Sequence, residues 1–111
     1  MIGVSIRAEV EPDQRRELIQ MCKSWLASSQ VPTACSERRV YEDVTSPTSL
    51  LLVEEWSNEE AMHAYLSSEP FRALIGAVKV LGNLVDLRVF ETEILEGGSA
   101  QAKQSKMRID G

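Results

Sequence analysis

The chain has 111 residues, of which 43% are hydrophobic and 26% charged, and its formal net charge is −5 at pH 7. This length suits one domain, and an acidic chain without a concentrated basic face is a poor match for nucleic acid. The longest apolar runs, 50–53 and 77–81, fall far short of the roughly 20 residues of a membrane helix. Residues 1–10 also lack the pattern of a signal peptide. We therefore expect a cytoplasmic protein that binds neither nucleic acid nor membrane.

The first third of the chain predicts a strand followed by a helix. Residues 2–8 alternate between apolar and polar side chains, which is the period of a strand with two different faces. Pro12 lies where a first helical position is expected, between acidic neighbours that suit a helix N-terminus. Apolar residues then recur at spacings of three and four over 18–26, and Trp25 belongs to this stripe.

The middle of the chain predicts a hairpin. Its strands are 35–44 and 50–56, with a turn at 45–48. The run 50–53 is apolar at every position, which indicates a strand covered on both faces. We expect helices on one face and the sheet of a partner subunit on the other. A loop or a ligand beside this run is the alternative.

The remaining residues predict a bent helical region and a last strand. Ser57 and Glu60 have the spacing of a capping box, Glu69-Pro70 interrupts the helical spacing, and 84–92 alternates again. The order βαββαβ predicts the α+β class, a ferredoxin-like domain over 1–95 with a four-stranded antiparallel sheet. Residues 96–111 hold almost no apolar surface, and we expect a flexible C-terminal tail there.

Metal and disulfide chemistry find little support in the sequence. The chain has two cysteines, Cys22 and Cys35, without CxxC spacing, and one histidine, His63. Neither a zinc site nor a disulfide framework is indicated, and we expect buried thiols and no metal. His63 lies two residues before Tyr65, which places it about 200° around the helix, toward solvent.

A combination of short motifs resembles a known family. The motifs are Tyr41-Glu42-Asp43, Leu52-Val53-Glu54-Glu55-Trp56, Tyr65-Leu66-Ser67-Ser68 and Phe71-Arg72. They resemble the antibiotic biosynthesis monooxygenase family, in which a strand ends in glutamate-x-tryptophan and a short helix, a serine and a phenylalanine follow. The resemblance implies a homodimer, a dimeric α+β barrel whose two sheets pack face to face, with a pocket between the helices and the sheet of each subunit.

The resemblance also suggests site residues. Trp56 stands where the family's tryptophan borders the pocket, and Tyr65 stands where many members carry a histidine. We expect Trp56 and Tyr65 to be catalytic, with core packing as the alternative for both. We expect Trp25, Phe71 and Arg88 to bind the substrate.

The charged residues of the predicted strands have competing interpretations. Arg88 shares a strand face with Asp86 and can pair with it instead of binding a ligand. Arg38 either binds an enolate or phosphate oxygen of a ligand in the pocket or pairs with a neighbouring acid, such as Glu42 or Asp43. Glu54 is either a general base or a dimer-contact carboxylate.

The family includes cofactor-free oxygenases, haem-degrading enzymes and isomerases, and the fold does not choose between them. Haem-degrading members place an axial histidine one turn or more along the second helical region. The corresponding residues here, 72–76, contain no iron ligand, so we expect no cofactor. The leading hypothesis is a cofactor-independent monooxygenase acting on a small aromatic or quinol-like molecule. The alternatives are a non-catalytic dimeric module that binds a small ligand or a protein, and an isomerase of a small metabolite that uses Arg88 with Glu54.

Overall fold

The computed structural model describes residues 1–97, which form one sheet with helices packed on it. The elements in chain order are β1 (Ile2–Val10), α1 (Arg15–Leu26), β2 (Cys35–Asp43), β3 (Ser46–Trp56), α2 (Glu59–Leu66), α3 (Glu69–Leu81) and β4 (Gly82–Glu91). The predicted βαββαβ order is confirmed, except that the second helical region is two helices instead of one bent helix. Apart from its first two residues, the predicted tail 96–111 lies outside the described residues.

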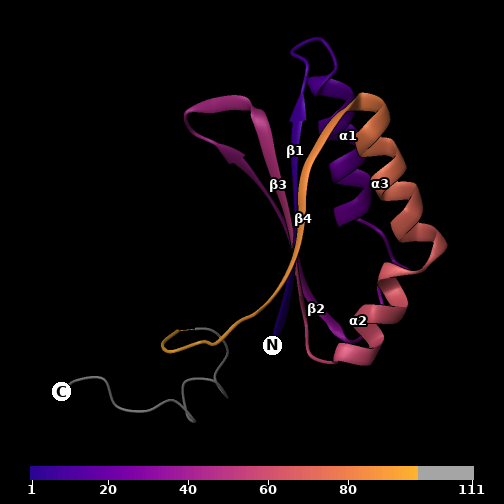
Figure 1. The fold of residues 1–111 in the computed structure, drawn as a ribbon, viewed down its shortest axis with the longest axis vertical. Coiled ribbons are helices and arrows are strands. Elements are labelled where there is room, and N and C mark those ends of the chain that lie inside the picture. The colour runs from indigo at the N-terminus through magenta and orange to yellow at the C-terminus, as the bar shows by residue number, and fades with distance from the viewer. Residues whose placement is uncertain (98–111) are drawn as a thin grey trace.

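The sheet has the strand order β2-β3-β1-β4, and every neighbouring pair is antiparallel. All three helices lie on one face of this sheet, and the opposite face is open (Figure 1). This is the predicted ferredoxin-like α+β architecture. β1 lies between β3 and β4, so the two ends of the described chain run side by side in the sheet.

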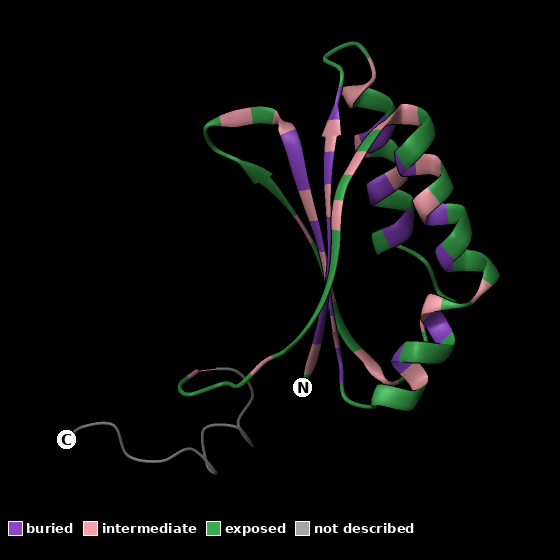
Figure 2. Cartoon of the chain, in the orientation of Figure 1, coloured by how far each residue is buried: buried purple, intermediate pink, exposed green. Residues whose placement is uncertain are grey.

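The hydrophobic core fills the space between the sheet and the helices (Figure 2). Alternate residues of β1 and β3 point into it because successive side chains of a strand face opposite ways. The largest fully buried side chains on the strands are Ile6, Leu50, Leu52 and Trp56. The helices contribute Leu18, Cys22, Trp25, Met62, Tyr65, Phe71, Leu74 and Val78.

The open face of the sheet is also partly apolar. Leu51 and Val53 of β3 are half-buried there, although no helix covers this face. Phe90 of β4 lies over Gly3, its partner on β1, since a Cβ atom on Gly3 would be 2.4 Å from the Phe90 ring. Gly3 therefore gives the aromatic ring room to lie flat on the sheet.

The two edge strands differ in character. β2 carries exposed charged residues along its length, among them Glu37, Arg39 and Glu42. β4 instead exposes apolar side chains, with Val85, Leu87 and Val89 between 42% and 50% exposed.

Two local boundaries differ from the sequence-based expectations. α1 begins at Arg15 and not at Pro12, because Pro12 and Asp13 form a turn that the Gln14 N–H closes on the carbonyl of Glu11. Proline and aspartate favour such turns as strongly as they favour a first helical turn. The hairpin turn lies at Val44-Thr45, so the expected turn at 45–48 is wrong for its last three residues.

The helix caps also differ. The N-cap of α2 is Asn58, whose side chain accepts a hydrogen bond from the Ala61 N–H at 2.8 Å, and the predicted Ser57 cap is wrong. At α3 the Ser68 side chain is the cap and Pro70 lies in the first turn. Glu69-Pro70 thus starts a new helix, because proline at a first turn costs no hydrogen bond.

Candidate functional site

A cavity of about 670 Å³ lies among the helices above β2. This volume is in the range that encloses a drug-sized ligand. The wall is mostly apolar or small, formed by Met21, Trp25, Pro32, Ala61, Ala64, Pro70, Ala73, Leu74 and Ala77. The polar side chains are those of Ser24, Ser28, Gln30, Arg38, Tyr65 and Ser68.

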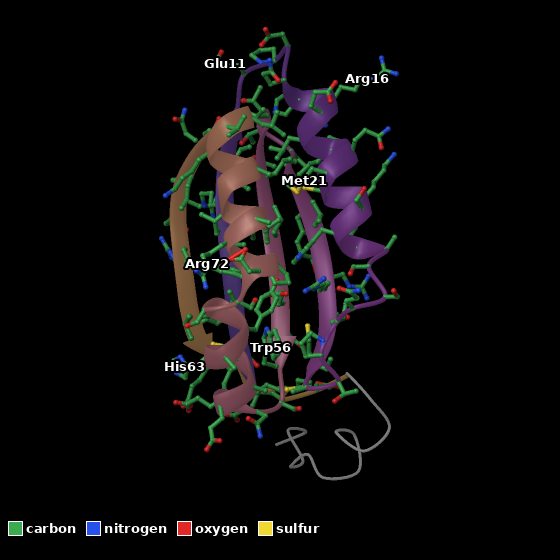
Figure 3. All side chains as sticks on the ribbon, turned by 90° about the vertical axis from the view of Figure 1, so that its right-hand side faces the viewer. Glu11, Arg16, Met21, Trp56, His63 and Arg72 are labelled. Atoms are coloured by element: carbon green, nitrogen blue, oxygen red, sulfur yellow. The ribbon has the colours of Figure 1, made fainter. Side chains whose placement is uncertain are left out.

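Helical spacing brings these residues to the cavity. Met21 and Trp25 are one turn apart on α1, Ala61 and Tyr65 one turn apart on α2, and Ala73 and Ala77 one turn apart on α3. Residues four apart share a helix face. Since the alanines are small, the facing helices leave a hollow between them. Figure 3 shows Met21 at the side of α1 that faces α3.

Among residues 1–97, Arg38 is the one charged side chain of the cavity wall, and it is held from three sides. Its Nε donates to Glu54 Oε2 at 2.9 Å, its Nη1 to the main-chain carbonyl of Trp25 at 3.1 Å, and its Nη2 to the Tyr65 hydroxyl at 3.1 Å. The guanidinium also lies 4.7 Å from the centre of the Trp25 ring, within cation–π range. Only 9% of the Arg38 side chain is exposed. It is therefore a fixed group.

Glu54 lies beneath Arg38 and is almost completely buried. It falls on the helix-facing side of β3 with Leu52 and Trp56, and it is opposite Arg38 in the β2–β3 register. Burial raises the pKa of the Glu54 carboxyl, and the charge of Arg38 opposes that rise. One carboxylate oxygen, Oε1, has no hydrogen-bond partner among the described residues. The interpretation of Glu54 as a dimer-contact carboxylate is wrong for the open sheet face, because the side chain points the other way.

Tyr65 joins this ion pair to an aromatic cluster. Its ring centre is 5.0 Å from that of Trp56 and 5.3 Å from that of Phe71. Such spacings stabilise aromatic pairs and fix the Tyr65 ring. Burial raises the pKa of the Tyr65 hydroxyl, so this group is neutral at physiological pH.

The predicted site residues divide into three groups. Trp25 and Tyr65 line the cavity. Trp56 is completely buried between α2 and the sheet, so it supports Tyr65 from below instead of facing the cavity, and Phe71 packs on Tyr65 in the same way. Arg88 lies on the open face of the sheet, opposite Ser5, and its side chain is 69% exposed. Arg88 is thus on the other side of the sheet from the cavity and from the other four predicted residues.

The two remaining charged candidates pair locally. Arg88 donates to Asp86 at 3.2 Å, which is the alternative predicted for it. His63 is exposed on the outer side of α2 and lies 3.7 Å from Glu59, as its helical position predicts (Figure 3).

Arg38 lines the cavity, but the sequence analysis did not identify its partner. The expected partner Glu42 pairs with Arg15 of α1, and Arg38 reaches Glu54 of the next strand. The alternation of side chains along β3 could have indicated this partner. Glu54 alternates with buried Leu52 and Trp56, and a buried carboxylate needs a cation on a neighbouring strand.

Metal binding and membrane insertion find no structural feature within residues 1–97. Residues 1–97 contain no cluster of three or more metal-binding side chains. None of the helices in this range is both long and apolar enough to cross a membrane.

Comparison with solved structures supports the same architecture. A conserved protein of Methanosarcina mazei superposes with a TM-score of 0.72 at 20% identity, covering 83% of this chain and 92% of that one. A protein of Deinococcus radiodurans, provisionally assigned as an antibiotic biosynthesis monooxygenase, superposes with a TM-score of 0.71 at 25% identity, covering 89% and 97%.

Sequence comparison identifies the family. An uncharacterized protein of Synechocystis sp. is 27% identical over 74 residues, and the match spans 67% of this chain but about half of that relative, 50% of its length. The family model described as antibiotic biosynthesis monooxygenase matches residues 1–77, from β1 into α3, which include Arg38, Glu54 and Tyr65. The chain therefore belongs to the antibiotic biosynthesis monooxygenase family.

Proposed function

We propose that the protein is a cofactor-independent monooxygenase that oxidises a small aromatic or quinol-like molecule in the cavity between α1, α2 and α3. The carrying observation is an apolar cavity of about 670 Å³ with Arg38 and Tyr65 at its wall. Such a site fits a flat molecule that needs one polar anchor. Family membership supports the same class of reaction.

The protein's part in this reaction is to bind and orient the substrate and to exclude water from it. An ionised quinol or anthrone can itself reduce dioxygen, so the cavity needs few chemical groups. With an anthrone, the ring methylene becomes a carbonyl, one oxygen atom enters the product and the other leaves as water. Tyr65 and Arg38 orient the substrate oxygen, Trp25 contacts its ring, and Trp56 and Phe71 keep Tyr65 in place.

We also infer a homodimer in which the open sheet faces of two copies pack together. Leu51, Val53 and Phe90 form a partly apolar surface that a second sheet would cover. In that arrangement Arg88 is an interface residue and not a substrate ligand.

Oxygen uptake tests the proposed activity. The purified, metal-stripped protein is mixed with a panel of reduced quinols and anthrones, and oxygen consumption is followed with an electrode. We expect protein-dependent uptake that falls by at least about tenfold in Tyr65→Phe, within the range attributed to one positioned polar group. The matched control is Tyr41→Phe, because Tyr41 is 52% exposed on β2.

The two alternatives predict different results. Binding of the same molecules without any oxygen uptake would favour a non-catalytic module. The isomerase alternative required Arg88 together with Glu54, and these residues lie on opposite faces of the sheet. That pair therefore cannot act on one small molecule within a single subunit.

A further inference from the structure

The ion pair at the cavity wall contains an acceptor that is not in use. Glu54 Oε2 accepts from Arg38, but Oε1 is buried and has no hydrogen-bond partner among the described residues. An ionised carboxylate can accept at both oxygens, and leaving one unpaired in a buried place is costly. Protonation of Oε1 would remove most of that cost.

Arg38 is the cation that an anionic ligand would meet in the cavity. A guanidinium has five N–H bonds, and three of them are used on Glu54, Trp25 and Tyr65. The side chain is fixed and lines the cavity, and among residues 1–97 no acidic side chain shares the cavity wall. An oxyanion bound in the cavity would therefore lie beside a cation, without a competing negative charge from the described wall.

Tyr65 connects the cavity with Glu54. Its hydroxyl oxygen accepts from Arg38 Nη2 at 3.1 Å, and Glu54 Oε2 accepts from Nε of the same guanidinium at 2.9 Å, so the hydroxyl and the carboxylate share one cation and the tyrosine proton is free to be donated. Cys35 of β2 is the other titratable group that interacts with the pair. The walls from α1 and α3 add no ionisable side chain, and β1 presents Val4 opposite Glu54.

We propose that Glu54 takes the proton of a phenol or enol bound in the cavity, with Tyr65 as the relay, so that the ligand remains beside Arg38 as an oxyanion. This inference rests on the proposed function, since it concerns the same cavity. The ligand O–H bond breaks and its electron pair stays on the ligand oxygen. Its proton goes to the Tyr65 oxygen while the Tyr65 proton goes to Glu54 Oε1, and nothing is oxidised or reduced.

Charge balance favours this transfer. Before it, Arg38 is paired with the Glu54 carboxylate, and after it Arg38 is paired with the ligand oxyanion beside a neutral Glu54. The net charge of the site is unchanged, so no new charge is created in a medium of low dielectric constant. Phenols and enols are thus the expected ligands. A carboxylate that is already ionised in water brings a second negative charge and should bind less well.

The test counts protons on the unmodified protein under nitrogen, with 1-naphthol as the probe. Absorbance reports whether bound naphthol is neutral or ionised, and calorimetry in two buffers of different ionisation enthalpy reports how many protons leave the complex. We expect bound naphthol to absorb as naphtholate at a pH about 1–3 units below the pKa of free naphthol, because the fixed cation stabilises the oxyanion and Glu54 takes the proton. We also expect no net proton release, because the proton stays on Glu54.

Variants provide the matched comparison. In Glu54→Gln any bound naphtholate must release one proton to the buffer, whereas Glu55→Gln, on the other face of the same strand, should behave as the parent protein. The ether 1-methoxynaphthalene should give neither signal. Naphthol that stays neutral, or one full proton released by the parent protein, would overturn the proposal.

Because oxygen is absent, this result is independent of turnover. Ionised binding with retained protons would support the inference even where oxygen uptake fails, and that outcome would refute only the monooxygenase. Oxygen uptake with neutral naphthol binding would refute the inference and leave the monooxygenase standing.

Discussion

Replacing Arg38 by glutamine should destabilise the protein more than any other charge removal on β2. The substitution breaks the ion pair with Glu54 and two further hydrogen bonds, and it leaves a carboxylate that is 2% exposed without its cation. Breaking one partner of a buried pair costs about 3–5 kcal/mol, a large part of the 5–15 kcal/mol that is typical of a domain.

The loss of stability in Arg38→Gln should depend on pH. An acid whose pKa rises on folding binds more protons in the folded state, so its effect on stability is favourable at low pH and is lost as pH rises above the unfolded-state pKa. Without Arg38 the pKa of Glu54 rises further, because the charge that opposed desolvation is gone. The cost of Arg38→Gln should therefore be small near about pH 4, where Glu54 is protonated in both states, and grow with increasing pH.

Urea unfolding followed by tryptophan fluorescence measures both effects at a fixed protein concentration, since dimerisation would make the midpoint depend on it. Arg39→Gln is the matched control, because its side chain is 60% exposed, and its unfolding midpoint should be unchanged. A cost of Arg38→Gln that equals the control, or that is the same at all pH values, would contradict the reasoning.

Three further outcomes are expected. Gly82→Ala should lower the unfolding free energy by about 1–3 kcal/mol, since its Cβ would lie 2.2 Å from the carbonyl oxygen of Glu9. The Cβ of Gly76→Ala would meet nothing within 4 Å, so this change should stabilise α3 by about 0.5–1 kcal/mol in the same urea assay. Leu51→Arg on the open sheet face should convert the proposed dimer to monomers in sedimentation velocity, and an unchanged sedimentation coefficient would exclude this face as the interface. Burial raises the pKa of the Cys22 thiol to about 11, so it should react with iodoacetamide at pH 8 only when the protein unfolds, and rapid alkylation of the native protein would refute its burial.

The periodicity of the chain was enough to predict the elements and their order. β1 and β4 were recognised because alternation reflects the two different faces of a strand, β3 because its run of apolar residues follows a turn, and α1 because its stripe of apolar residues reflects one covered face. The boundaries were less predictable. Pro12, Ser57 and Pro70 each suit more than one local structure, and tertiary contacts choose among them.

The candidate site was predictable only in part. Tyr65 and Trp25 were named through a family resemblance and an apolar stripe, and both line the cavity. The pairing of Arg38 with Glu54 was not predicted because strand arginines usually pair with nearby acids on the surface. Its true partner is set by the register of β2 against β3. Register depends on where the hairpin turns, and the predicted turn was displaced toward β3. An error of this kind moves every cross-strand partner.

The contrast between the two edge strands bears on how the protein aggregates at high concentration. Unpaired strand edges recruit strands of other molecules, and charged side chains along an edge discourage this. β2 has that protection, with Glu37, Arg39 and Glu42 exposed along it. β4 is less protected, since Val85, Leu87 and Val89 are exposed along it between the charged Asp86 and Arg88. Aggregation by strand addition should thus begin at β4, and a lysine placed at Val85 is the substitution most suited to suppress it.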